Sequence, residues 1–317
     1  MFKGCRVGVV VPAYNEERQI ETVLATMPEF VDRIFVVDDC SPDKTSEVTQ
    51  NWASKKQSHR VQLIRHGVNG GVGRAITTGY KAALEADMEV IAVMAGDGQM
   101  DPKELPMILE PVADGKADYS KGNRLTSGIA WQKTPRVRYL GNAFLSLLTK
   151  IASGYWHVAD TQSGYTAISA EALKAINLDD LYPSYGYPND MLVRLNVRNF
   201  RVADVHITPR YGIGERSSMK VWKVIPTVSF LLLRGFFYRM FEKYVIRDFH
   251  PLVFFYALGF LLVLIGFILG VVETIAKISR GDIAIATVVL VALLTISGMQ
   301  LLLFAMWFDM EYNKELR

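Results

Sequence analysis

The sequence predicts an α/β domain with a mostly parallel, Rossmann-like sheet, followed by interfacial helices and a two-helix transmembrane hairpin. Two observations lead to this fold class. Apolar, strand-like runs alternate with helix-like stretches through residues 1–120, which is typical of strand-helix-strand units. Uncharged apolar residues then gather near the end of the chain, in two stretches that are each long enough to cross a bilayer.

The N-terminal part shows four strand-like runs, each followed by a helix-like stretch. The strands are expected at residues 6–11, 34–37, 61–65 and 90–95, and the helices at residues 16–27, 44–54, 71–85 and 102–113. Residues 119–207 are less regular. Functional loops in such sheets follow the carboxyl ends of the strands, so the polar clusters at residues 12–16, 38–45 and 97–101 predict a site there.

The C-terminal part carries the two apolar stretches. Residues 252–272 contain no charge, and residues 283–308 contain only Gln300 as a strongly polar side chain. We therefore expect one domain over residues 1–220, amphipathic juxtamembrane helices over residues 221–250, and transmembrane helices over residues 251–273 and 283–308. A pair of helices buried in a soluble core is the alternative, and it is disfavoured because both stretches are apolar on every side.

Charge predicts the orientation and the compartment. Residues 209–250 hold eight basic and three acidic residues, whereas the connector between the apolar stretches has only Lys277 and Arg280 as basic residues. The positive-inside rule then places the N-terminal domain and both chain ends in the cytoplasm. Residues 1–11 lack the pattern of a signal peptide, and Cys5 and Cys40 fit a reducing compartment. The net charge of +3 is too small to predict a nucleic-acid partner.

The first two polar clusters lie at the ends of the first two expected strands. VVVPAYNEE, at residues 9–17, contains Pro12, Tyr14 and Glu16, and VVDDCSPDKT, at residues 36–45, ends its strand on Asp38 and Asp39. A carboxylate pair in this position is able to accept hydrogen bonds from ribose hydroxyls or from a base. Ordinary turn and helix-cap residues would give similar patterns, so neither cluster decides the function by itself.

The next two clusters suit phosphate and metal. HGVNGGVGRAITTGY, at residues 66–80, is a glycine-rich stretch that includes Gly71 and opens a helix, and its backbone amides would suit a phosphate. It lacks the GK[ST] ending of a P-loop. VMAGDGQMDP, at residues 93–102, offers Asp97 and Gln99 as oxygen ligands after a strand, which suits a hard divalent cation.

In their order and spacing the four clusters resemble the family 2 inverting glycosyltransferases of the GT-A fold, in particular the branch of dolichyl-phosphate mannose synthases and polyprenyl-phosphate glucosyltransferases. The resemblance spans residues 7–220. It implies that Asp97 and Gln99 hold Mg²⁺ or Mn²⁺ against the diphosphate of a nucleotide donor. Ala95 departs from the pattern, because members of this branch often carry an acidic residue there. The expected donor-site residues are Pro12, Tyr14, Glu16, Asp38, Asp39, Gly71, Asp97 and Ser217.

The resemblance also implies an acceptor side and a loop that closes on the diphosphate. Binding of the acceptor phosphate suits arginine, because its planar fork donates two hydrogen bonds to one phosphate. The expected acceptor-site residues are Arg124, Arg136, Arg138, Asn142, Ser146 and Ser163. Asp190, Arg216 and Lys220 join Asp97 as the expected catalytic residues. Exposed arginines on a helix, or basic side chains that face anionic lipid, are the alternatives.

The activity that the resemblance implies is inverting transfer of one sugar from a nucleotide-sugar, GDP-mannose or a UDP-hexose, to a polyprenyl (dolichyl or undecaprenyl) phosphate in a lipid bilayer. A processive polysaccharide synthase is a second hypothesis, weakened by the missing QxxRW motif and the single hairpin. A third is a non-catalytic lipid-binding or flippase-like protein with a degenerate transferase domain. Gly259, Gly266 and Gly270 would allow a homo-oligomer, and lipid-facing glycines explain them equally well.

Overall fold

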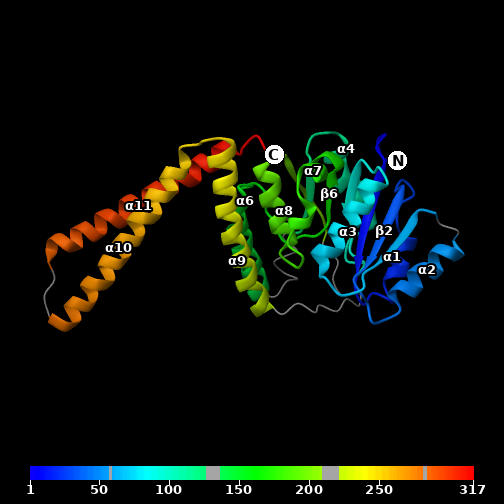
Figure 1. The fold of residues 1–317 in the computed structure, drawn as a ribbon, viewed down its shortest axis with the longest axis horizontal. Coiled ribbons are helices and arrows are strands. Elements are labelled where there is room, and N and C mark those ends of the chain that lie inside the picture. Colours follow the sequence, from blue (N-terminus) through cyan, green and yellow to red (C-terminus); the bar gives the residue numbers. More distant parts are fainter. Residues whose placement is uncertain (57–58, 126–135, 209–220, 281–283) are drawn as a thin grey trace. The chain divides into compact units, whose positions relative to one another are not determined.

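The computed structural model of the chain describes residues 1–56, 59–125, 136–208, 221–280 and 284–317 (Figure 1). It divides into two compact units. Unit 1 comprises Met1–Phe237 together with Leu316–Arg317, and unit 2 comprises Tyr238–Glu315. Each unit has its own packing and is described by itself.

Unit 1 is built on a mixed sheet whose strands, over the described residues, follow the order β3-β2-β1-β4-β6-β5-β7. The strands are β1 (Val7–Ala13), β2 (Arg33–Asp38), β3 (Val61–Arg65), β4 (Val90–Val93), β5 (Tyr119–Asn123), β6 (Thr166–Ser169) and β7 (Val202–His206). β1 pairs in parallel with β2 and β4, β2 with β3, and β5 with β7. β6 alone runs antiparallel to its neighbours β4 and β5. The predicted mostly parallel sheet is confirmed.

The helices of unit 1 alternate with these strands. They are α1 (Ile20–Ala25), α2 (Thr45–Lys55), α3 (Val72–Glu85), the 3₁₀ helix η1 (Pro102–Glu104), α4 (Leu105–Ala113), α6 (Arg136–Ser153), α7 (Ala170–Ala175), the 3₁₀ helix η2 (Leu178–Asp180), α8 (Tyr187–Val197) and α9 (Val221–Phe241). The expected start of the first helix at residue 16 is wrong. Residues 17–19 form a turn, in which the amides of Gln19 and Ile20 both donate to the Glu16 carbonyl oxygen, at 3.1 and 2.9 Å, and α1 begins only at Ile20.

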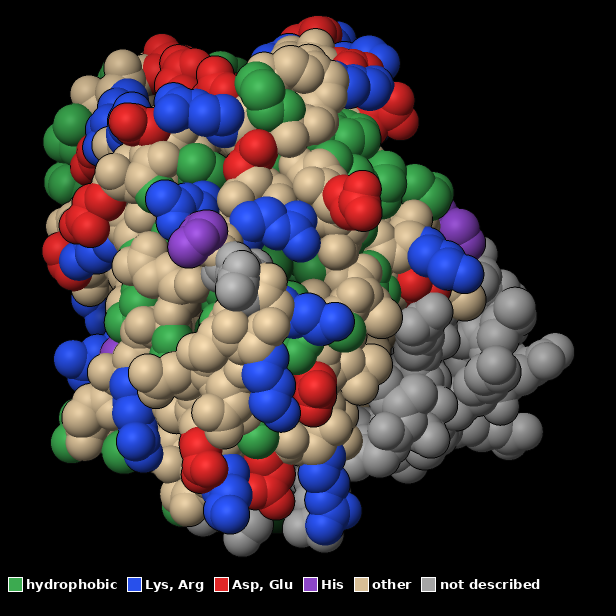
Figure 2. Space-filling model, turned by 90° about the vertical axis from the view of Figure 1, so that its right-hand side faces the viewer, with side chains coloured by type: hydrophobic (Ala, Val, Ile, Leu, Met, Phe, Trp, Pro, Cys, Tyr) green, Lys and Arg blue, Asp and Glu red, His purple; other side chains and the backbone are tan. Residues whose placement is uncertain are grey.

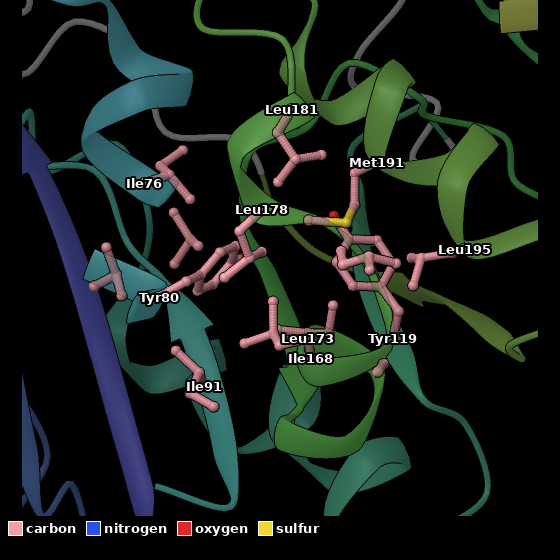
Figure 3. Close-up of a cluster of buried hydrophobic side chains, with 14 of the residues drawn as sticks. Ile76, Tyr80, Ile91, Tyr119, Ile168, Leu173, Leu178, Leu181, Met191 and Leu195 are labelled. Carbon is pink, nitrogen blue, oxygen red and sulfur yellow. The ribbon is translucent and has the colours of Figure 1, made fainter. Parts of the chain in front are cut away.

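Two hydrophobic clusters lie on opposite faces of the sheet, because successive strand residues point to opposite faces. On one face Val10 belongs to a buried cluster with Tyr80 of α3 and Met191 of α8 (Figure 3). On the other face Val11 belongs to a cluster with Leu109 of α4. Among the described residues, the sheet therefore carries a hydrophobic cluster on each face.

Helix α9 packs on α8 with one side only. Val228 and Leu232 are 2% and 3% exposed, and a Cβ atom at Gly186, next to the start of α8, would lie 2.5 Å from Leu231. The other side of α9 carries Phe230, which is 70% exposed. The inner side of this helix therefore belongs to the packing of unit 1, and its outer side is apolar and uncovered.

The chain returns to unit 1 after it has passed through unit 2. The amide of Val202 in β7 donates to the carbonyl oxygen of Leu316 at 3.0 Å, and the Leu316 side chain packs against the cluster that contains Tyr80. Unit 2 is thus inserted between Phe237 and Leu316.

Unit 2 consists of the end of α9, a π-helical turn (Glu242–Arg247) and the long helices α10 (Leu252–Arg280) and α11 (Ile285–Tyr312). Both long helices are candidate membrane spans, over Leu252–Ser279 and Ile285–Tyr312, with mean hydropathies of 2.8 and 2.4. Only 22% and 11% of their most apolar windows are buried. A core helix of a soluble protein would be mostly buried, so these helices favour association with a membrane.

The glycines of α10 face α11 within the same hairpin. A Cβ atom at Gly259 would lie 2.9 Å from Leu302, one at Gly266 would lie 2.7 Å from the Thr295 hydroxyl, and one at Gly270 would lie 3.4 Å from Val291. These glycines serve close packing between the two helices of one chain. A homo-oligomer stays a prediction, and it no longer rests on them.

A buried polar network joins the start of unit 2 to the end of α11. Arg239 and Asp309 are both 0% exposed, and two hydrogen bonds of 2.6 and 3.0 Å connect them. Tyr244 donates to Asp309 at 2.6 Å, and the Lys243 ammonium donates to Asn313 at 2.7 Å. Burial lowers the pKa of Lys243 to about 7. Each buried charge in this network is matched by a hydrogen-bonding partner.

The surface shown in Figure 2 carries charges of both signs. Lysine and arginine side chains are interspersed with aspartate and glutamate side chains over this face. Interspersed charges cancel at a distance of a few Debye lengths, so this face produces no strong field of one sign.

Candidate active site

The loops after β1, β2 and β4 lie beside one another at the carboxyl edge of the sheet. The Gly96 amide donates to the carbonyl oxygen of Pro12 at 3.0 Å, and the Asp39 amide donates to that of Ala13 at 3.0 Å. Parallel pairing of β1 with β2 and β4 brings these three strand ends to one edge. The structure therefore gathers the polar clusters that the sequence places far apart, and the 44% exposed Tyr14 stands at their surface.

Glu16 and Asp97 form the acidic part of this edge. A Cβ atom at Gly96 would lie 3.5 Å from Cγ of Glu16, and the Glu16 amide is fixed by the Thr45 hydroxyl at 2.9 Å. Burial raises the pKa of Glu16 to about 7, and the negative charges of Asp97 and Asp43 add to this shift. The carboxylates thus repel one another until a proton or another cation lies near them.

This edge fits a divalent cation that keeps most of its ligands from substrate and water. The Gln99 amide donates to Asp97 Oδ1 at 3.0 Å, which folds the turn that carries both side chains. Within the described ranges no group of three or more His, Cys, Asp or Glu residues is placed to hold a metal. Oxygen donors next to repelling carboxylates suit Mg²⁺ or Mn²⁺, with phosphate oxygens as further ligands.

Asp38 points away from this edge. It is 0% exposed, accepts the Ser41 amide at 2.8 Å and also accepts the Ser46 hydroxyl. These bonds tie the loop after β2 to the start of α2. Its side chain is engaged inside the protein, whereas the neighbouring Asp39 is turned toward the glycine-rich loop.

Asp39 organises the glycine-rich loop through both carboxylate oxygens. Its Oδ1 atom accepts the Gly70 amide at 2.9 Å and lies 2.7 Å from His66 Nδ1, and its Oδ2 atom accepts the Gly71 amide at 2.7 Å. His66 Nε2 lies 2.9 Å from the Thr78 hydroxyl of α3. The two glycine amides are therefore already bound to a carboxylate, and Asp39 is only 3% exposed.

The glycine-rich loop in turn supports the segment before α8. Gly71 has a φ of 89°, and a Cβ atom there would lie 2.6 Å from the carbonyl oxygen of Pro183. The Arg74 amide donates to that same oxygen at 3.1 Å. Asp190 accepts the amide of Tyr182 at 3.0 Å. A continuous chain of contacts thus leads from Asp39 to Asp190.

Asp190 also pairs with Arg194. The Arg194 Nε atom lies 2.9 Å from Asp190 Oδ2, one helical turn away on α8. The Asp190 carboxylate is 10% exposed and is held by both the Tyr182 amide and this guanidinium. Such a carboxylate is well placed to orient a neighbouring group, and its charge is already partly neutralised.

Arg124 is held by a carboxylate of the acceptor-side loop, which is the part of the chain at residues 160–165, before β6. Asp160 is 1% exposed and accepts hydrogen bonds from Arg124 Nε at 2.7 Å and from Nη2 at 3.1 Å. Burial opposes ionisation of Asp160, yet the Arg124 charge keeps the pKa of Asp160 below its usual value. In the same layer the buried Lys121 ammonium donates to the Ser163 carbonyl oxygen, and burial lowers the pKa of Lys121 to about 7.

A small cavity of about 50 Å³ brings the metal side and the acceptor side together. It is lined by Gln99 from the loop after β4, Arg124 from the end of β5 and Ser163 from the acceptor-side loop. Ser163 is 2% exposed, and Ser146 is 4% exposed and accepts the Thr161 hydroxyl at 3.3 Å. Both serines are buried, so contact with an acceptor would require the adjoining chain to move.

Six of the expected site residues have side chains that lie outside the described part of the structure. The backbone of α6 includes Arg136, Arg138 and Asn142, but their side chains lie outside the described part of the structure. Arg216, Ser217 and Lys220 lie in residues 209–220, which are outside the described residues. Their roles stay predictions.

Three residues of the candidate site were not singled out as site residues from the sequence, namely His66, Lys121 and Asp160. His66 opens the glycine-rich cluster, and Asp160 opens DTQSGYTAIS, at residues 160–169, which resembles the acceptor-side loop of the family, so both positions carried a signal. Lys121 lies in the middle of β5 as an isolated lysine, and nothing in its sequence neighbourhood marks it as buried.

Comparison with known families agrees with this geometry. The family model described as glycosyl transferase family 2 matches residues 8–176, which is more than half of the chain. The chain belongs to glycosyl transferase family 2. It is a glycosyltransferase, and the family predicted from the four clusters is confirmed.

Relatives of this family 2 protein include enzymes of lipid-linked sugars. The UDP-N-acetylglucosamine–dolichyl-phosphate N-acetylglucosaminyltransferase of Methanococcus voltae is 29% identical over 64% of this chain and 85% of its own length. The undecaprenyl-phosphate mannosyltransferase of Micrococcus luteus is 32% identical over 64% of this chain and 83% of its own length.

The family 2 fold is also found among solved structures. The glucosyl-3-phosphoglycerate synthase of Mycobacterium tuberculosis, crystallised with Mn²⁺ and UDP, superposes with a TM-score of 0.56 at 19% identity. The match covers 74% of this chain and 80% of that one. The same enzyme has been crystallised with Mg²⁺ and UDP. The likeness confirms the GT-A fold.

Proposed function

We propose that this family 2 enzyme transfers a single sugar from a nucleotide-sugar to a polyprenyl phosphate at a membrane surface, with inversion at the anomeric carbon. The observation that carries the proposal is the combination of two parts in one chain. Unit 1 has the strand-end site of family 2, and unit 2 has two long, mostly uncovered apolar helices. Relatives whose names specify dolichyl or undecaprenyl phosphate support the acceptor.

Donor binding is assigned to the edge formed by β1, β2 and β4. Asp97 and Gln99 would hold Mg²⁺ or Mn²⁺, which supplies positive charge to the departing nucleoside diphosphate. Glu16 keeps this edge acidic, and Asp39 fixes the glycine-rich loop against it. Since the repulsion around Glu16 opposes an anionic diphosphate, we expect donor binding to require the divalent cation.

The acceptor needs orientation more than it needs a base. A phosphate monoester has a second pKa near 6, so at neutral pH it is already a nucleophilic anion. Arg124 would bind it, held in place by Asp160. Asp190 would orient the sugar or the acceptor, because its carboxylate is fixed by Tyr182 and Arg194. Arg216, Ser217 and Lys220 are proposed to close on the diphosphate.

The membrane completes this proposal. A polyprenyl tail stays in the bilayer, so its phosphate meets a soluble nucleotide-sugar only at the interface. We assign catalysis to residues 1–220, interfacial helices to residues 221–250 and membrane passage to residues 251–273 and 283–308. The basic collar at residues 209–250 favours a cytoplasmic catalytic unit and cytoplasmic chain ends.

A donor panel tests the proposal. Membranes containing the protein are incubated with Mn²⁺, undecaprenyl or dolichyl phosphate, and radiolabelled GDP-mannose, UDP-glucose or UDP-N-acetylglucosamine. We expect one lipid-linked monosaccharide from one donor, and Asp97→Ala should lower its formation by at least about 10³-fold, because several kcal/mol of charge stabilisation is lost. A labelled polymer would indicate a processive synthase, and no lipid-linked product from any donor would refute the proposal.

The stereochemistry of the product is a second test. Nuclear magnetic resonance of the released sugar phosphate should show the anomeric configuration opposite to that of the donor. Retention, or a trapped glycosyl-enzyme, would contradict a single in-line displacement.

A further inference from the structure

Glu104 lines the cavity between the metal side and the acceptor side, and the proposed mechanism gives it no role. The cavity of about 50 Å³ is bounded by the loop after β4, the end of β5, the acceptor-side loop and the end of β7. Its polar lining includes Gln99, Asp101, Glu104, Arg124, Ser163 and Thr208. Glu104 enters it from the start of α4.

The two oxygens of the Glu104 carboxylate differ in their surroundings. Oε1 accepts the Thr208 amide at 2.8 Å, which fixes the side chain at the end of β7. Oε2 is buried, and among the described residues no hydrogen-bond donor lies against it. A buried carboxylate oxygen without a donor costs free energy, and a ligand that supplies the missing hydrogen bond would offset this cost.

We propose that Glu104 is a specificity-determining residue whose Oε2 atom accepts a hydrogen bond from one hydroxyl of the transferred sugar. This inference rests on the proposed function. The carboxylate would repel a phosphate or a diphosphate, whereas a hydroxyl supplies the donor that this oxygen lacks. A volume of about 50 Å³ admits a hydroxyl or hydroxymethyl group and excludes a whole sugar ring.

The placement of the cavity supports a sugar over other hydroxyl compounds. Gln99 connects it to the loop that would hold the donor diphosphate, and Arg124 connects it to the acceptor phosphate. The transferred sugar must lie between these two phosphates during the reaction. A hydroxyl bound here would be recognised next to the reacting carbon, where discrimination between donors affects the rate most strongly.

An isosteric variant isolates this one oxygen. Glu104→Gln keeps a carbonyl oxygen for the Thr208 amide and replaces the second oxygen with an amino group, which donates instead of accepting. Glu110→Gln on the adjoining helix α4 is the matched control, because Glu110 is exposed and its bond to Lys3 lies at the surface. Full-length wild type and both variants are assayed with the preferred donor and with analogues that each lack one sugar hydroxyl.

We expect Glu104→Gln to lower kcat/KM for the preferred donor by about 10- to 100-fold, with an unchanged melting temperature and no effect of Glu110→Gln. For one analogue, the one without the recognised hydroxyl, wild type and Glu104→Gln should become equal. Equal activity on the preferred donor, or the same loss for every analogue, would overturn the assignment. Wild type that is inactive with every donor would instead refute the proposed function.

Discussion

At the scale of single residues, Glu16 is the group whose protonation responds most directly to substrate. Its pKa of about 7 results from burial and from the charges of Asp97 and Asp43. A divalent cation brings positive charge to the same edge, so its binding should release a proton near neutral pH. The affinity for the cation, measured by calorimetric titration, should therefore rise with pH up to about 7.

The same shift predicts how stability depends on pH. The pKa of Glu16 is higher in the folded protein, at about 7, than its ordinary value of 4.5. The protonated carboxyl group therefore contributes its full stabilisation below pH 4.5, and this contribution is lost as the pH rises to about 7. Without metal, the melting temperature of wild type should fall relative to that of Glu16→Gln between about pH 5 and pH 7.5. If the difference in melting temperature between the two proteins stayed constant across this pH range, the assignment would be contradicted.

Single residues were partly predictable from the sequence. Asp97 and Gln99 follow a strand in a recognisable cluster, and the structure places them at the expected edge. Asp38 and Asp39 look alike in the sequence, yet one is engaged by Ser41 and Ser46 and the other by glycine amides. The direction of each side chain depends on which neighbouring loop lies closest, and a strand-end motif does not contain that information.

At the scale of elements, the Arg239–Asp309 pair determines how unit 2 is held together. Removal of one partner leaves a buried charge without compensation, which costs about 3–5 kcal/mol. Asp309→Ala should therefore lower the free energy of unfolding by about this amount in detergent micelles, as measured by thermal or chemical unfolding.

The matched control replaces both charges by apolar side chains. Arg239→Met combined with Asp309→Leu should recover most of the loss, because the arginine no longer remains as a buried charge without its carboxylate, and Lys243 keeps its hydrogen bond to Asn313. A double variant as unstable as Asp309→Ala would mean that the cost comes from altered packing and not from the uncompensated arginine.

Elements were predicted well where the hydrophobic pattern is regular. Val61–Arg65 is a strand as expected, and the helix expected at residues 71–85 is α3. The elements within residues 119–207 were not predicted from the sequence. One reason is that β6 has only four residues and pairs antiparallel with β4 and β5, which are distant from it in the sequence. A short strand buried on both faces shows no alternation, and its partners are chosen by tertiary packing.

At the scale of the whole molecule, the compact unit 1 continues beyond residue 220 to Phe237. Gly235 of α9 lies against Val193 of α8, so a cut at residue 220 would remove this contact. A chain that ends at Phe237 keeps this contact, and it lacks both the hairpin and the bond from Val202 to Leu316.

We expect the chain that ends at Phe237 to bind nucleotide and Mn²⁺ nearly as well as the full protein. Its transfer to long-chain polyprenyl phosphate in vesicles should fall by at least about 100-fold, since the hairpin no longer concentrates it at the bilayer. Calorimetric titration measures the first property and radiolabelled transfer the second. A short, water-soluble acceptor controls for loss of catalysis, and undiminished transfer in vesicles would refute the role of the hairpin.

The bond between Val202 and Leu316 also has a consequence for biogenesis. The edge strand β7 receives its last partner from residues that the ribosome makes only after both apolar helices. The catalytic unit therefore completes this contact only after both apolar helices have been made. A chain without Leu316 would leave the Val202 amide without this acceptor and the cluster around Tyr80 without the Leu316 side chain.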